Sequence, residues 1–133
     1  MSKYDVNKFK QVTVALNTPF QPDGSVDLKA VRAVVNYFYN KGIRQMYVCG
    51  STGEGFLLDT QERMAVTETV VEEAAGRMNI IVHVGCPDTR HSEELARHAE
   101  KAGADATSAV PCVYYRMGEE SVFQHWTKIT EAA

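Results

Sequence analysis

The chain has 133 residues, 44% of them hydrophobic and 23% charged, and its formal net charge is −3. These values are typical of a globular protein, and we expect residues 1–133 to form one domain. Acidic residues outnumber basic ones by 17 to 14 and no basic run occurs, which argues against nucleic acid or a membrane surface as a partner. The polar first ten residues lack the apolar segment of a secretory signal, so we expect a cytoplasmic protein.

The first predicted strand is the β-rich run at residues 10–18, which stops at Pro19 and is followed by a turn. Residues 27–41 carry apolar side chains at helical spacing, and Gly42 is suited to end that helix. The short apolar run 45–49 predicts a second strand, from which a glycine-rich loop departs.

A second helix is predicted to begin at Asp59 or the residue after it, because Asp59 and Glu62 have the spacing of a capping box. We expect Gly76 to end this helix. The β-branched run 79–84 then predicts a third strand, which ends before Gly85.

A third helix is predicted over residues 89–102, a fourth strand over 104–110 and a last helix over 119–132. Strands without in/out alternation, separated by helices, indicate a parallel sheet covered by helices. Part of a closed barrel and a flavodoxin-like open sheet share this alternation, and the pattern alone does not separate them.

Ligands of parallel α/β folds bind at the carboxyl ends of the strands, so the loops that leave the strands there carry the candidate site. The most informative is the glycine loop (residues 50–55, GSTGEG), since glycines permit close approach and successive amides form an anion-binding concavity. A small carboxylate suits such converging donors. A tight turn whose hydroxyls bond only local backbone explains the same residues equally well. The candidate binding residues are Ser51 and Thr52, with Gly50, Gly53 and Glu54 in support.

The other two loops carry weaker candidates. His83 precedes one of them, and a buried core histidine is the favoured interpretation over a ligand contact. Tyr114, beside Tyr115, suits a proton relay and a subunit interface equally, and a solvated Arg116 is favoured over a carboxylate partner. Other titratable groups are expected to be solvated on helix surfaces: His91, His98, His125, Glu68, Glu72 and Glu73. The three cysteines, Cys49, Cys86 and Cys112, are expected to be free thiols, and no metal site is predicted.

Four segments together resemble the N-terminal half of the dihydrodipicolinate synthase and N-acetylneuraminate lyase superfamily. They are LNTPF, YVCGSTGEGFLLDTQER, IVHVGCPDT and ATSAVPCVYY, in the family's own order. The resemblance implies a (β/α)8 TIM barrel, of which this chain would form about the first four βα units, a half-barrel. Cys49 stands where the family commonly has glycine. Within the superfamily, Ser51 and His83 resemble the lyase branch more closely.

The resemblance also implies a reaction, the aldol cleavage of N-acetylneuraminate to N-acetylmannosamine and pyruvate. It implies a lysine Schiff base, no metal or organic cofactor, and a homotetramer. Ser51 and Thr52 match the positions that hold the pyruvate carboxylate, and Tyr114 matches a tyrosine that reaches a neighbouring subunit's site in the synthase branch. The Schiff-base lysine and the proton-donor tyrosine are expected beyond Ala133, and helix-borne Lys101 and Lys128 are not substitutes.

Three functions are therefore considered. The first is a sialic acid lyase, and the second is a dihydrodipicolinate synthase or another 2-keto-3-deoxy sugar acid aldolase. The third is a non-catalytic truncated fragment that self-associates through open strand edges and uncovered inner apolar residues. Because cleavage needs a nucleophilic lysine, the chain alone is predicted to be inactive.

Overall fold

A single parallel sheet organises the computed structural model, which describes residues 5–111 and 114–133. Its strands are β1 (Val14–Ala15), β2 (Gln45–Val48), β3 (Asn79–His83) and β4 (Ala106–Ser108). The sheet order is β1-β2-β3-β4, so each strand pairs with the one before it in the chain. A flavodoxin-like sheet would place the first strand between the second and the third. The structure therefore excludes the open-sheet alternative.

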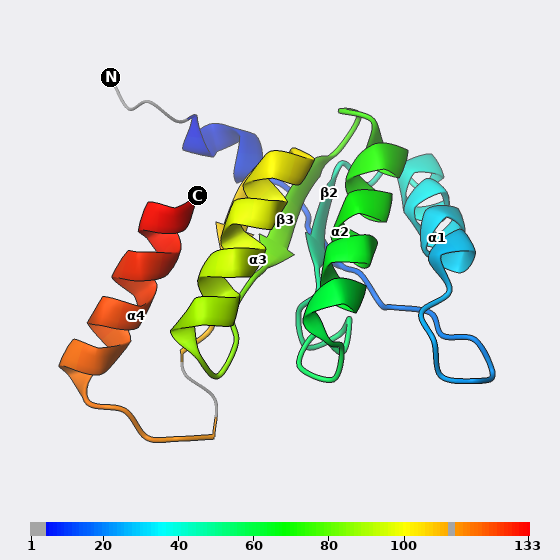
Figure 1. The fold of residues 1–133 in the computed structure, drawn as a ribbon. Helices are drawn as coiled ribbons and strands as arrows, with labels where there is room; N and C mark the ends of the chain where they lie inside the picture. Colours follow the sequence, from blue (N-terminus) through cyan, green and yellow to red (C-terminus); the bar gives the residue numbers. More distant parts are fainter. Residues whose placement is uncertain (1–4, 112–113) are drawn as a thin grey trace.

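Four helices cover one face of this sheet, as Figure 1 shows. They are α1 (Leu28–Asn40), α2 (Thr60–Ala74), α3 (Thr89–Ala102) and α4 (Glu119–Ala132), and a short 3-10 helix η1 (Val6–Phe9) precedes β1. Each helix packs against the next in the chain. Placing all helices on one face is the winding of a barrel wall, whereas an open doubly wound sheet has helices on both faces.

The hydrophobic core lies between the sheet and the helices. Met46 and Val48 of β2 and Ile80 and Val82 of β3 face the helices and are buried. The core is completed from the helices by Val31, Val35, Val66, Val70, Leu95, Ala96 and Ala99. Alternation along the strands turns five other residues to the opposite face, namely Gln45, Tyr47, Asn79, Ile81 and His83. This inner face mixes polar residues with the half-buried Tyr47 and Ile81, so the prediction of uncovered inner apolar residues is confirmed only in part.

The N-terminal segment covers the amino ends of the strands. Gln45 is buried there and its amide nitrogen donates to the Phe9 carbonyl and the Thr13 hydroxyl. Asn79 donates to the carbonyl of Lys8 at 2.9 Å, and the Lys8 ammonium pairs with Asp105 at 2.8 Å. The polar inner face is therefore satisfied at this end, and the opposite end carries the candidate site.

The helices begin close to where they were predicted, whereas the outer strands are shorter. β1 has two residues and β4 has three, within predicted runs at 10–18 and 104–110. Each outer strand has a ladder partner on one side only, which limits regular pairing. The capping box of α2 is confirmed, but Ala75, left-handed at φ 47°, already ends this helix before Gly76.

The last helix buries a histidine that was predicted to be solvated. His125 is only 4% exposed and Ile129 is buried beside it, whereas Trp126 is 39% exposed. The reason is that α4 packs against α3, where the Nδ1 atom of His125 lies 2.9 Å from the hydroxyl of Thr89. The prediction of a solvated His125 was therefore wrong.

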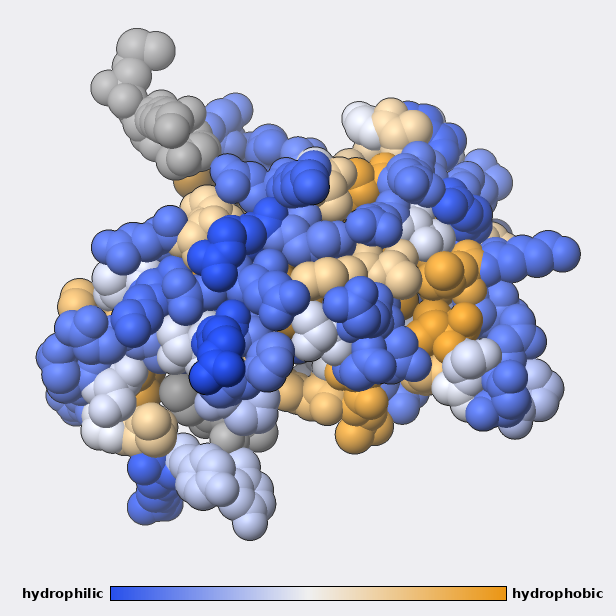
Figure 2. All heavy atoms as spheres, viewed as in Figure 1, coloured by the Kyte–Doolittle hydropathy of each residue, from blue (hydrophilic) through white to orange (hydrophobic). Residues whose placement is uncertain are grey.

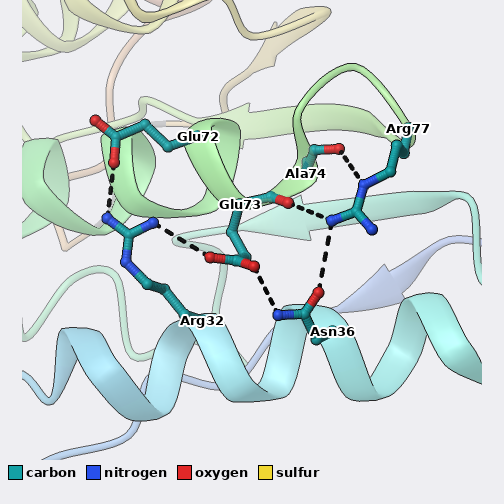
Figure 3. A network of polar contacts seen from close by, with 6 residues as sticks. All are labelled: Arg32, Asn36, Glu72, Glu73, Ala74 and Arg77. Atoms are coloured by element: carbon teal, nitrogen blue, oxygen red, sulfur yellow. Dashed lines mark hydrogen bonds and ion pairs between the residues drawn. The ribbon is translucent and has the colours of Figure 1, made fainter.

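Two glutamates predicted to be solvated belong to a polar network between α1 and α2 (Figure 3). Arg32 contacts exposed Glu72 at 2.7 Å and half-buried Glu73 at 3.3 Å, while the Asn36 amide donates to Glu73 at 2.6 Å. Arg77 donates to the Glu73 backbone carbonyl and to Asn36. Glu73 is thus a structural link between two helices, which lowers the pKa of its carboxyl through the Asn36 and Arg32 hydrogen bonds.

The outer surface of the helices is predominantly hydrophilic, as Figure 2 shows. Among the described residues, none of the helices has the length and apolar composition needed to cross a membrane.

Candidate functional site

A pocket of about 270 Å³ lies at the carboxyl ends of the strands. Four of its lining residues come from the glycine loop and four from the strands or their ends. They are Gly50, Ser51, Thr52 and Gly53, together with Ala15, Tyr47, His83 and Val110. The structure thus places four of the predicted loop residues around one cavity, at the end of the sheet where ligands of such folds bind.

The glycines of the loop stand where no side chain fits. A Cβ added at Gly55 would lie 1.9 Å from the Cys49 carbonyl oxygen, and one at Gly53 would lie 2.8 Å from the Leu16 carbonyl oxygen. A Cβ at Gly50 would meet the ring of Tyr47 at 2.5 Å. Glycine is therefore required at Gly53 and Gly55 by backbone contacts and at Gly50 by the Tyr47 ring.

The loop leaves several donors free for a ligand. Two amides close the turn: Glu54 donates to the Ser51 carbonyl at 3.1 Å, and Gly55 donates to the Gly50 carbonyl at 3.0 Å. Within residues 5–111 and 114–133, the amides of Ser51, Thr52 and Gly53 and the two hydroxyls find no protein acceptor, and Ser51 and Thr52 are exposed. The alternative in which those hydroxyls satisfy local backbone is not what the described part of the chain shows. Such an array of donors suits an anion.

Thr18 fixes this loop by a side-chain hydrogen bond. Its hydroxyl donates to the Gly53 carbonyl at 2.7 Å, and its side chain is buried. The Gly53 carbonyl therefore turns inward and its amide stays on the pocket side. Thr18 was not identified as a site residue from the sequence, although a threonine directly before Pro19 in an apolar run was the available signal.

Cys49 begins the loop in a strained conformation. Its φ is 59°, in the left-handed region that favours glycine, and its side chain is buried. The positive φ gives a physical reason for the glycine that the family resemblance implies at this position. Burial raises the pKa of the Cys49 thiol to about 11 and also raises the pKa of the half-buried Cys86 thiol. Both are free, as predicted, and Cys112 lies outside the described residues.

His83 is a buried histidine, as the favoured interpretation predicted, and it also lines the pocket. Its Nε2 atom accepts a hydrogen bond from the Val110 amide at 3.3 Å. Burial, followed by the nearby charge of Arg63, lowers the pKa of His83 to about 4. The imidazole is therefore neutral at physiological pH and serves as an acceptor.

Tyr47 lines the pocket beside His83, at 6.3 Å between ring centroids. Its hydroxyl lies 3.0 Å from the Ser108 hydroxyl and thereby links β2 to β4 across the inner face. Tyr47 was not among the site residues predicted from the sequence. Its position between the core-facing Met46 and Val48 was the signal that it points to the other face.

Tyr114, the candidate relay, does not line this pocket. It is 90% exposed, has a φ of 76° and packs against Tyr115 edge to face at 4.9 Å. Its role stays a prediction that requires a second subunit. Arg116 and Glu54 are exposed, His91 pairs with Asp88 at 2.7 Å, and His98 bonds Glu68 at 2.8 Å. Groups of three or more metal-ligating side chains are absent among the residues that the structure describes.

A singly wound parallel wall with an anion-receptive glycine loop at its carboxyl end is the arrangement of half a (β/α)8 barrel enzyme. The family model described as the dihydrodipicolinate synthetase family matches residues 8–133. The chain belongs to this family, which confirms the resemblance seen in its sequence.

Individual relatives agree with this assignment. The chain is 36% identical over 129 residues to the N-acetylneuraminate lyase of Mediterraneibacter gnavus, a match that covers 97% of the chain and 41% of that lyase. It is 41% identical over 120 residues to the 4-hydroxy-tetrahydrodipicolinate synthase of Chlorobaculum parvum, a match that covers 90% of the chain and 40% of that synthase. The chain therefore spans about two fifths of the length of these curated relatives.

The solved structures confirm the fold. A structure described as a Ruminococcus gnavus sialic acid aldolase catalytic lysine mutant superposes with a TM-score of 0.94 at 36% identity, covering 97% of this chain and 42% of that one. The chain is thus a four-stranded α/β half-barrel of the TIM-barrel aldolase type.

Proposed function

We propose that this chain supplies the carboxylate-binding half of an N-acetylneuraminate lyase-type aldolase, which cleaves sialic acid to N-acetylmannosamine and pyruvate. The observation that carries the proposal is the set of donors at Ser51, Thr52 and Gly53, which the described residues leave unpaired along one pocket. A carboxylate accepts several converging hydrogen bonds, and fixed amides provide them without reorganisation.

The carbon–carbon bond is cleaved through an iminium between a lysine and the keto group, which accepts the electrons of the breaking bond. Among the described residues no lysine lines the pocket. The relative whose description names a catalytic lysine is more than twice as long as the matched region. We therefore place the nucleophile, together with the proton-donor tyrosine, outside residues 1–133, and the chain alone is inactive.

The part played by this half is to bind and orient the keto acid. The glycine loop holds the carboxylate, and the Tyr47 hydroxyl and the neutral His83 imidazole form the adjoining wall. Holding a reactant in a fixed orientation lowers the entropic cost of the following step.

Pyruvate binding is the direct test. We expect nuclear magnetic resonance titration of the chain with pyruvate to shift the amides of Ser51, Thr52 and Gly53, whereas acetone, which has the ketone but no carboxylate, leaves them in place. The variant Thr52→Val should weaken binding about threefold to tenfold, since it removes one hydroxyl donor. Equal shifts with acetone, or shifts that map elsewhere, would refute the carboxylate site.

A second candidate keeps the fold and changes the substrate, namely a dihydrodipicolinate synthase or another 2-keto-3-deoxy sugar acid aldolase. The identity to the synthase of Chlorobaculum parvum supports it, while the Ser51 and His83 pair supports the lyase. We propose joining the chain to the second half of the Mediterraneibacter gnavus lyase and assaying both reactions. Pyruvate release from sialic acid supports the lyase, and synthase turnover alone supports the alternative.

We also propose that the complete enzyme is a cytoplasmic homotetramer. The exposed pair Tyr114 and Tyr115 supports an interface role, because aromatic residues are enriched at interfaces.

A further inference from the structure

A buried arginine lies behind the pocket, and no acidic side chain of the described residues pairs with it. Arg63 of α2 is only 3% exposed, yet it forms no ion pair with any acidic side chain of the described residues. Buried charges are usually paired, since desolvation is costly. Its Nε atom is also buried without a partner in this part of the chain. A contribution to stability alone therefore does not explain why this guanidinium is buried.

The guanidinium instead donates hydrogen bonds to acceptors at the carboxyl end of β3. Its Nη2 atom donates to the His83 carbonyl at 2.7 Å, and its Nη1 atom donates to the Gly85 carbonyl at 3.1 Å. Nη1 also contacts the Cys86 sulfur at 3.1 Å. A planar fork of donors is suited to holding two carbonyls at once, which an ammonium group is not. Arg63 thus fixes the backbone on both sides of the turn after β3.

This turn determines where the His83 side chain lies. The imidazole extends toward the end of β4, where Nε2 accepts from the Val110 amide, and its ring meets Phe56 edge to face at 5.4 Å. The Nη2 atom of Arg63 lies 3.5 Å from Nδ1. Tyr47, a titratable group on β2, also packs against the ring. Because Val110 only donates, Nε2 accepts and the proton of the neutral ring is on Nδ1. The guanidinium of Arg63 also only donates, so its 3.5 Å approach to Nδ1 is a packing contact and not a hydrogen bond.

We propose that Arg63 is a positioning residue. By clamping the end of β3 it presents the neutral His83 imidazole as the acceptor that holds Val110, and so it fixes the pocket wall opposite the glycine loop. The geometry stands without any ligand, and its meaning for catalysis rests on the proposed function. If Arg63 only stabilised the fold, its replacement would change neither the tautomer of His83 nor the hydrogen exchange of the Val110 amide.

Hydrogen exchange and imidazole nitrogen resonances test this on the chain itself. In Arg63→Met we expect exchange at the Val110 amide to accelerate about tenfold relative to the Met46 amide in β2, as expected for one lost hydrogen bond. We also expect the His83 ring to lose its single Nδ1–H tautomer and its pKa to rise toward the ordinary value. Arg77→Met, which removes another arginine just after the end of α2, is the matched control and should change neither signal.

Three further variants keep the test valid if Arg63→Met fails to fold. Arg63→Lys keeps the charge and loses the fork, so we expect partial acceleration at Val110. His83→Leu removes the acceptor and should accelerate Val110 fully, whereas His83→Gln offers an amide oxygen and should retain protection. Unchanged Val110 protection and an unchanged His83 tautomer in a folded Arg63 variant would overturn the proposal. Pyruvate titration is a separate measurement, so failure of the carboxylate site and failure of this clamp are distinguishable.

Discussion

Individual residues determine whether the glycine loop has its shape. Thr18, Gly53 and Gly55 hold the loop against the strands by backbone contacts, while Cys49 accepts a left-handed φ to enter it. These constraints act through carbonyl oxygens, which cannot move aside as a flexible side chain can. Small changes at these positions should therefore have large effects.

We predict that Gly55→Ala destabilises the chain by roughly 2–4 kcal/mol, because its Cβ would overlap the Cys49 carbonyl. Pyruvate-induced shifts in the loop should disappear as well. Chemical denaturation and the titration described above measure both effects. Gly118→Ala is the matched control, since a Cβ there meets nothing within 4 Å. Equal stability of the two variants would contradict the tight packing of the loop.

We predict that His83 makes the folded chain less stable as the pH falls. Its folded pKa is about 4 and its ordinary value is 6.5, so between these values the unfolded chain binds a proton that the folded chain does not. Stability contributed by the neutral form is complete above pH 6.5 and falls by up to about 1.4 kcal/mol per pH unit toward pH 4. Urea unfolding at several pH values measures this slope. The slope should be shallower in His83→Gln, and an identical slope would contradict the shifted pKa.

At the scale of elements, the helix termini are where local sequence acts most directly. The Asp59 side chain accepts from the Glu62 amide at 2.8 Å, and the Glu62 side chain accepts from the Asp59 amide at 2.9 Å. These bonds satisfy donors that the first turn of α2 would otherwise leave unpaired. Because α2 carries Arg63, its start also sets where the positioning residue lies.

We predict that Asp59→Ala lowers the free energy of unfolding by about 1 kcal/mol, the usual cost of losing an N-cap. Thermal and urea denaturation provide the measurement. Glu131→Ala, which removes an exposed acid from α4, should change stability by less than about 0.5 kcal/mol. A loss of stability equal in both variants would point to net charge as the cause.

At the scale of the whole molecule, the sheet is a wall with two outer strands, β1 and β4, and an inner face without helices in the described part. The pocket is lined from three strands and the glycine loop, yet none of its described lining residues is a nucleophilic lysine. We therefore expect this chain to bind the keto acid without cleaving a carbon–carbon bond.

We predict that borohydride reduction in the presence of pyruvate leaves no pyruvate adduct on any lysine of this chain, as read by mass spectrometry. The expectation follows because an iminium requires a lysine amine in contact with the bound keto group. The same treatment of the chimera with the second half of the Mediterraneibacter gnavus lyase is the positive control. A stable adduct on the chain alone would overturn the proposed division of roles.

Self-association remains a prediction of the third function considered. Outer strands with unpaired backbone groups favour edge pairing, while the polar residues of the inner face, Gln45, Asn79 and His83, oppose indiscriminate aggregation. We expect sedimentation to show a discrete small oligomer in place of a broad distribution. A well-behaved monomer would count against this function.

The sequence by itself determined the order of elements, the capping box of α2 and the loop of glycines, because each depends on neighbouring residues along the chain. It also carried the family resemblance through GSTGEG and its flanking segments. The tertiary structure alone decided that the sheet is singly wound, that His125 is buried and that Arg63 and His83 meet behind the pocket. Those outcomes depend on which strands pair and which helix faces pack together, and such long-range contacts leave no local pattern in the sequence.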